Sequence, residues 1–248
     1  MRHPVSDPFP RHRSPRPFLA AGLLLLALAL PACAPKNVHP EIRERARAIR
    51  TIGIVRPDVS VYALSAGGQL ELVSEWSEEG RNNLLAAVVR QLAHRSTKLE
   101  VVQPDEGTAA LLDEVRPLAA AIGATVSGQS YLDAPPFDRH GRFVHSVGSL
   151  AGEPERNGVE ALLVITAYDE ISSYGRRALI AVGKITGLLF GDPPRKGSTA
   201  ITMMLLDRDG AVLWYAELRE PGTFDLRSSG SAEQAVVKVL ASFPGAIR

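Results

Sequence analysis

Cysteine is almost absent from this chain: Cys33 is the only one among 248 residues. A single cysteine cannot close a disulfide within the chain, so stability has to come from a packed core. A chain of this length is long enough to bury such a core in one domain.

An excess of positive charge is also missing beyond residue 32. The chain has 28 Lys/Arg and 27 Asp/Glu residues, of which four and one lie in residues 1–32. The remaining 24 basic and 26 acidic residues give a net charge of −2. Nucleic-acid binding requires a clear excess of clustered Lys and Arg. We therefore expect no nucleic-acid partner.

Long apolar runs are missing as well. The run Phe18–Leu30 has 13 residues, whereas a transmembrane helix needs about 20. Four arginines precede it, against one acid, Asp7. A cationic start followed by a short apolar run is typical of a secretory signal peptide.

The apolar run ends in Leu30-Pro31-Ala32-Cys33, followed by Ala34. This segment resembles the lipobox of bacterial lipoproteins. The resemblance implies that residues 1–32 are a signal peptide and that the thiol of Cys33 becomes acylated. No thiol would then remain for a cysteine nucleophile or a thiolate metal site. Ala34 is not the aspartate that retains lipoproteins in the inner membrane of enteric bacteria, so we expect the periplasmic face of the outer membrane. A multiply acylated cysteine anchors stably, whereas a single chain is marginal.

Residues 33–50 are predicted to be the lipidated N-terminus and a tether, because proline and charged residues dominate them. Residues 51–248 are predicted to form one α/β domain, with helices packed on a mixed β-sheet. The apolar run 161–167 favours a central strand covered on both faces. Apolar periodicity predicts strands at 51–55, 59–64, 69–74, 99–102, 161–167, 199–206 and 211–218, and helices at 78–94, 108–122, 177–190 and 231–243.

Two of these segments carry additional expectations. Residues 177–190 are apolar enough to contact a membrane, but core packing is the favoured interpretation. Asp209-Gly210 is the strongest short hairpin signal in the chain. Asp207–Gly210 also resembles the start of a calcium loop, but its twelfth position is Leu218 rather than glutamate, so the hairpin is favoured.

Candidate catalytic and ligand-binding patterns are sparse. No serine stands in the G-x-S-x-G frame of a nucleophile elbow. Asp138, His140 and His145 are close in sequence but have no recognised metal-ligand spacing. Ser172–Arg177 is the nearest approach to a phosphate loop, and a turn with a helix cap is favoured there. We therefore expect no catalytic residue, no metal and no cofactor. If the chain were a serine hydrolase instead, the candidate nucleophiles would be Ser130 and Ser149, and the candidate bases would be His94, His140 and His145.

The hairpin sequence Leu206–Trp214 and the last helix, which closes on Phe243-Pro244, carry a second resemblance. The chain is similar to proteobacterial periplasmic lipoproteins with the fold of the curli secretion lipoprotein and of the N-terminal domain of the Tol-system propeller protein. That resemblance spans roughly residues 51–244. It implies binding and assembly in the envelope, and it supplies no catalytic residue.

The sequence therefore predicts a non-enzymatic binding or assembly factor of the cell envelope, anchored through Cys33 and contacting an envelope protein partner. One alternative is an oligomeric secretion-channel component of the outer membrane. Residues 142–150 and 177–190 stand where the curli secretion lipoprotein has membrane-spanning hairpins, but neither alternates as such strands do. The other alternative is the envelope serine hydrolase.

Overall fold

The structure is a computed structural model, and a defined subset of residues is described. These are residues 44–45, 48–93, 98–102, 106, 109–118, 121, 146–148, 150, 158–190 and 195–243, without the side chains of 184–190. All of them belong to one compact unit, residues 37–248. Cys33 and most of the tether lie outside the described residues, so their roles stay predictions.

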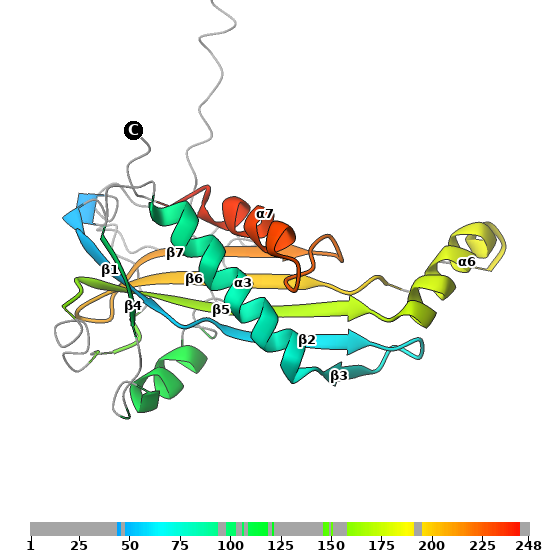
Figure 1. Cartoon of the computed structure of the whole chain (residues 1–248), viewed down its shortest axis with the longest axis horizontal. Coiled ribbons are helices and arrows are strands. Elements are labelled where there is room, and N and C mark those ends of the chain that lie inside the picture. Colours follow the sequence, from blue (N-terminus) through cyan, green and yellow to red (C-terminus); the bar gives the residue numbers. More distant parts are fainter. Residues whose placement is uncertain are drawn as a thin grey trace, which may run out of the picture. The chain divides into compact units, whose positions relative to one another are not determined.

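A seven-stranded mixed sheet organises the unit (Figure 1). The predicted fold class, helices packed on a mixed sheet, is confirmed. The strands are β1 (Thr51–Val55), β2 (Asp58–Leu64), β3 (Leu70–Leu72), β4 (Lys98–Val102), β5 (Ala161–Ser172), β6 (Thr199–Asp207) and β7 (Val212–Glu220).

Strand β5 is the centre of the sheet because it pairs along both edges. One edge pairs in parallel, first with β1 and then with β2. The other edge pairs antiparallel with β6 over nine residues, from Ala161↔Asp207 to Asp169↔Thr199. β4 extends the sheet beside β1, β3 extends it beside β2, and β7 extends it beside β6. The apolar run of β5 therefore fixes the position of every other strand.

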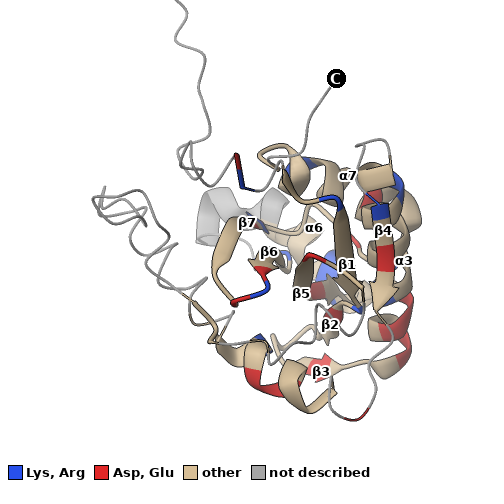
Figure 2. Cartoon of the chain, turned by 90° about the vertical axis from the view of Figure 1, so that its left-hand side faces the viewer, with Lys and Arg blue, Asp and Glu red and all other residues tan. Residues whose placement is uncertain are grey.

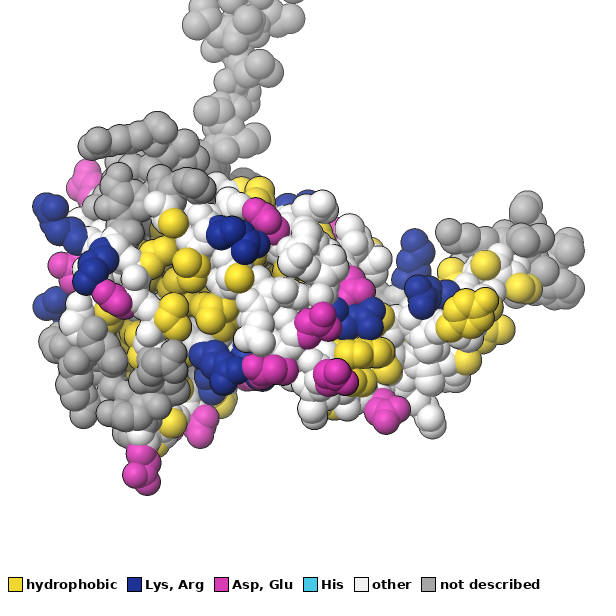
Figure 3. All heavy atoms as spheres, viewed as in Figure 1, with side chains coloured by type: hydrophobic (Ala, Val, Ile, Leu, Met, Phe, Trp, Pro, Cys, Tyr) yellow, Lys and Arg dark blue, Asp and Glu magenta, His cyan; other side chains and the backbone are white. Residues whose placement is uncertain are grey.

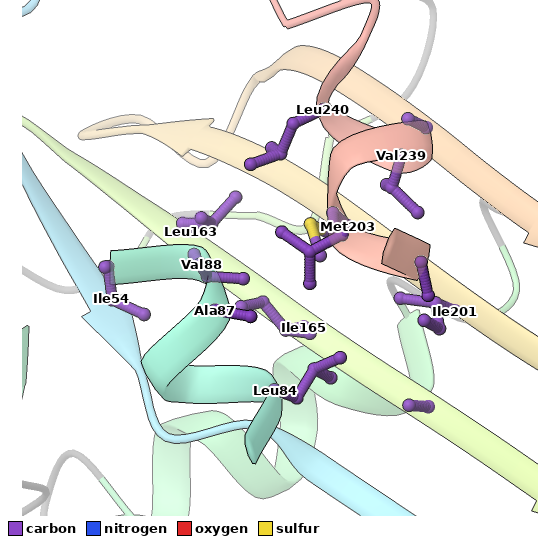
Figure 4. Packing of buried hydrophobic residues seen from close by; sticks show 14 of the residues in the cluster. Ile54, Leu84, Ala87, Val88, Leu163, Ile165, Ile201, Met203, Val239 and Leu240 are labelled. Atoms are coloured by element: carbon purple, nitrogen blue, oxygen red, sulfur yellow. The ribbon is translucent and has the colours of Figure 1, made fainter. Parts of the chain in front are cut away.

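Helices α3 (Ser74–Ala93) and α7 (Ser229–Leu240) cover one face of the sheet (Figures 1 and 2). Leu84 and Val88 of α3 and Val239 of α7 pack with Ile165 and Met203 of the sheet (Figure 4). Burial of one such side chain contributes about 1.5–3 kcal/mol. The larger core cluster therefore ties these two helices to the central strands.

A second cluster covers the opposite face near the start of β5. Leu112 and Val115, from the helical residues 109–118, pack there with Val147, Leu162 and Val164. Because β5 is buried on both faces in this half, its sequence is continuously apolar. The expectation of a central strand covered on both faces is confirmed.

Helix α3 begins at Ser74, earlier than the sequence predicted from a cap at Ser77. The Ser77 hydroxyl donates a hydrogen bond to the Val73 carbonyl (2.9 Å) and accepts one from the Val61 amide (2.9 Å). Ser77 therefore lies inside the helix and joins it to β2. Gly80 permits the close approach, because a Cβ there would lie 3.3 Å from Val59 Cγ1.

The hairpin predicted at Asp209-Gly210 is confirmed between β6 and β7. Gly210 has a φ of +73°, and an added Cβ would lie 1.8 Å from the Gly148 carbonyl oxygen. Both facts require glycine at this turn. The following strand carries Trp214, which is fully buried; its indole nitrogen donates to the Ser242 carbonyl at 3.1 Å.

The predicted helix at 177–190 is also confirmed, as α6 (Tyr174–Phe190), but its expected burial in the core is wrong for most of the described side chains. Leu179 and Val182 are 46% and 56% exposed, whereas Ile180 is buried. α6 follows the carboxyl end of β5 and lies beyond the sheet (Figure 1). Within the described residues, no helix combines the length and apolar character needed to span a membrane.

Candidate functional site

A pocket of about 310 Å³ lies where the end of β5, the first turns of α6, the entry to β6 and the β7–α7 loop meet. The end of β5 leads directly into α6, and the β5–β6 pairing brings the entry to β6 back to the same place. Its lining residues are Glu170, Ile171, Ser172, Arg177, Ile180, Lys196, Gly222, Phe224, Asp225 and Arg227.

A fully buried carboxylate, Asp169, fixes the β7–α7 loop that lines one side of this pocket. Asp169 accepts hydrogen bonds from the Thr199 hydroxyl (2.7 Å) and from the Leu226 amide (2.9 Å). Burial raises the pKa of Asp169 to about 6, although both hydrogen bonds act to lower it. From the other side, Asn83 of α3 donates to the carbonyls of Leu226 (3.1 Å) and Arg227 (2.7 Å). The β7–α7 loop is therefore fixed by two separate elements.

The same loop contains an ion pair in which both partners lie within the loop. The Arg227 guanidinium donates to both carboxylate oxygens of Asp225, at 2.7 and 2.9 Å, and lies 4.3 Å from the Trp76 ring centroid. The hydrogen bond from Arg227 lowers the pKa of Asp225, and the pKa of Arg227 is raised in return. A bidentate pair of this geometry leaves little charge available to a ligand.

A second carboxylate, Glu170, is also paired with an arginine. It follows Asp169 along β5, so its side chain lies on the opposite face of the strand. Glu170 accepts hydrogen bonds from the Tyr168 hydroxyl (2.6 Å) and from Arg195 (2.6 and 3.2 Å). Burial would raise the pKa of Glu170, but these two donors lower it below its ordinary value. The pKa of Tyr168 is raised, first by burial and then by Glu170. Both carboxylates that line the pocket are thus already matched by arginines.

Arg176 fixes the direction of α6. This buried side chain donates to the carbonyl of Arg195 (3.0 Å) and to the carbonyl of Ser65 in the β2–β3 turn (3.2 Å). The Ser173 hydroxyl accepts from the Arg176 amide (3.3 Å) and caps the helix. The structure therefore has a turn and a helix cap at Ser172–Arg177, which is the interpretation that the sequence favoured.

Two pocket cations remain unmatched in the part of the chain that the structure describes. The side chains of Arg177 and Lys196 both line the pocket, and neither forms a hydrogen bond or an ion pair with the side chain of a described residue, although the charge of Arg177 contributes to the lowered pKa of Asp225. Ile171, Ile180 and Phe224 supply its apolar walls. The pocket therefore offers two available positive charges beside apolar surface, an arrangement suited to a group that is both anionic and apolar.

A second pocket, of about 300 Å³, lies near the start of β5 and contains Asp207 and Asp209. One carboxylate oxygen of Asp207 accepts from the amides of Asp209 (3.0 Å) and Ala211 (2.9 Å), and the other pairs with Arg45. These contacts form a hairpin turn, as favoured over a calcium loop. Among the described residues, no three His, Cys, Asp or Glu side chains are grouped to hold a metal.

The sequence-predicted candidates Cys33, His94, Ser130, Asp138, His140, His145 and Ser149 lie outside the described residues. Sequence reasoning overlooked Asp169 and Arg227 altogether. Asp169 and Glu170 are two acids that directly follow an apolar strand sequence, and this was the available signal. Nothing local in the sequence indicates that Asp169 bonds to Leu226, 57 positions away.

Comparisons with known proteins give little support for any assignment. No protein-family model matches the chain, and no curated protein matches it. Among solved structures, the chain is similar to a PelC dodecamer from Paraburkholderia phytofirmans, with 10% identity, a TM-score of 0.34, and coverage of 80% of this chain and 89% of that one. A single-substitution variant of the same dodecamer matches with 10% identity, a TM-score of 0.34, and coverage of 79% and 90%. A likeness at this TM-score carries no inference about function or assembly.

Proposed function

We propose that this chain is a lipoprotein of the outer membrane, facing the periplasm, that acts without catalysis as a binding or assembly factor of the envelope. Two features support this proposal: the lipobox-like sequence that ends at Cys33 and the pocket at the end of β5. The partner is a protein that presents an acidic group beside an apolar side chain.

The observation that carries the proposal is the pair of available cations. Asp225 is matched by Arg227, and Glu170 is matched by Arg195, so Arg177 and Lys196 provide the net charge of the pocket. The walls behind them are fixed through Asp169 and Asn83. A fixed wall lowers the ordering cost of binding, which favours affinity.

Chemical cross-linking in living cells, followed by mass spectrometry, tests the binding role. We expect the protein with both Arg177→Glu and Lys196→Glu to lose its cross-linked envelope partner, because two attractive charges become repulsive. The control carries Arg90→Glu and Lys98→Glu, the same charge change on α3 and β4; it breaks two exposed ion pairs, with Glu233 and Glu100, so the thermal unfolding midpoint of both double variants is measured alongside. Equal partner capture by both double variants would refute the pocket as the binding site, and turnover of a substrate by the purified protein would refute the non-catalytic role.

The anchor has its own test. The membrane-extracted protein is expected to have the mass of residues 33–248 plus acyl chains, and Cys33→Ser should abolish this modification. A mass that retains residues 1–32, or that lacks acyl chains, would refute the lipoprotein assignment.

A further inference from the structure

The exposed apolar side chains of α6 form the starting observation. Tyr174 is 83% exposed, and Leu179 and Val182 are each about half exposed. Figure 3 shows apolar side chains on this helix at one end of the molecule, with basic side chains at its base. Large apolar side chains grouped in this way mark an interaction site more often than isolated ones do.

These positions follow the helical repeat. Tyr174, Ala178 and Val182 are spaced by four residues, and all three are exposed. Residues at this spacing occupy one face of a helix. The sequence continues the pattern at Ile185 and Leu189. α6 therefore presents an apolar stripe rather than scattered apolar residues.

The charge of α6 has a single sign. No acidic residue occurs between Glu170 and Asp192, whereas Arg176, Arg177 and Lys184 give the segment a charge of +3. Arg176 is buried at the base of the helix and donates to backbone carbonyls. Arg177 and Lys184 are separated by seven residues, so their positions share one side of the helix.

We propose that α6 lies in the surface of a membrane rich in anionic phospholipid, with its apolar stripe at the boundary between headgroups and acyl chains. An in-plane helix needs an apolar face, a cationic flank and limited overall hydrophobicity, and α6 combines these features. A positively charged helix without acids complements an anionic surface. A second copy of this chain would instead bring two positively charged helices together.

The geometry of the anchored end is compatible with this position. Residue 45 contacts Asp207, near the start of β5, while α6 follows the end of β5. The twelve strand residues of β5 span about 40 Å, and the chain from Cys33 to residue 44 can extend to a similar length of about 40 Å. The domain can therefore contact one membrane both through α6 and through the proposed acyl anchor. The affinity of α6 for lipid does not itself require the anchor.

Depth-dependent fluorescence quenching tests the proposal on the full mature chain. A Val182→Cys protein is labelled with an environment-sensitive fluorophore and reconstituted into phosphatidylethanolamine/phosphatidylglycerol vesicles that contain nitroxide lipids. We expect strong quenching at position 182 and little at the matched control, Val237→Cys, because Val237 is 48% exposed on α7. Intact mass verifies the acylation of Cys33 and the attachment of one label.

Three results would overturn the proposal. The first is quenching at position 182 no greater than at position 237. The second is a fluorophore at position 182 that neither aqueous iodide nor nitroxide lipid quenches, because such a fluorophore is covered by protein rather than by lipid. The third is equal quenching in zwitterionic and anionic vesicles, since each surface cation is expected to contribute roughly fivefold to binding.

A second variant separates lipid contact from folding. Tyr174→Asp with Ala178→Asp, in the labelled Val182→Cys background, is expected to reduce quenching at least tenfold, because two charges enter the apolar stripe. Both side chains are exposed, so the thermal unfolding midpoint should stay unchanged. Unaltered quenching in this folded variant would contradict the proposal, whether or not Cys33 is acylated.

Discussion

The buried carboxylate of Asp169 gives the most quantitative prediction. Its pKa is raised from 3.8 to about 6, so the folded protein holds a proton that the unfolded chain releases at lower pH. Stability from this group is therefore fully present below about pH 4 and is lost as the pH rises toward 6. A shift of about two pH units corresponds to about 3 kcal/mol of unfolding free energy.

The perturbation that isolates this effect is Asp169→Asn, which removes the titration and keeps the shape of the side chain. Asparagine has one acceptor oxygen, whereas Asp169 accepts from both Thr199 and Leu226. The variant therefore carries a fixed cost of about 1–3 kcal/mol from an unmatched donor, and this cost does not depend on pH. Only the titration makes the difference between the two proteins change with pH.

Urea unfolding of both proteins from pH 4 to pH 7.5 measures this difference. We expect the unfolding free energy of the wild type to fall by about 2.4 kcal/mol relative to Asp169→Asn between pH 4 and pH 7. Other carboxylates titrate equally in both proteins and cancel. A difference that stays constant, or that changes in favour of the wild type as the pH rises, would refute the assignment of a raised pKa to burial.

Two further substitutions test the core and the hairpin. Trp214→Ala should lower the unfolding free energy by about 3–5 kcal/mol, because the indole is fully buried and packs edge-on against Phe243 at 4.9 Å; the exposed-site control Val237→Ala should change it by less than about 0.5 kcal/mol. Gly210→Ala should cost more than about 2 kcal/mol, because the added Cβ would meet the Gly148 carbonyl at a positive φ; a near-neutral result in urea unfolding would contradict the turn geometry.

The elements that the sequence predicted correctly are those encoded by local pattern. The apolar run of β5 indicated a central strand, and Asp209-Gly210 indicated the β6–β7 hairpin. The burial of α6 was predicted wrongly, because an apolar helical repeat is the same for a core helix and for a helix beyond the sheet. Which of these it is depends on where β5 ends, and that follows from the registers of β2 and β6.

The pocket was beyond sequence reasoning for a different reason. Its wall depends on hydrogen bonds between Asp169 and Leu226 and between Asn83 and Arg227, which are 57 and 144 positions apart. Polar residues of this kind normally indicate solvent-exposed loops, and only the tertiary fold buries Asp169. Acids that directly follow an apolar run are therefore candidate structural carboxylates, because the strand can continue through them, as β5 does.

The two proposals share one residue, and this leads to a last prediction. Arg177 lines the pocket and also lies on the cationic side of α6. An anionic lipid headgroup and the acidic group of a protein partner therefore compete for the same guanidinium. Linkage requires the competition to be reciprocal: anionic vesicles should weaken partner binding by the same factor by which the partner weakens vesicle binding. Affinities measured for the wild type and for Arg177→Gln test this, because the coupling should vanish in the variant while Lys196 still supports residual partner binding. Coupling of equal size in both proteins would show that Arg177 does not link the two surfaces.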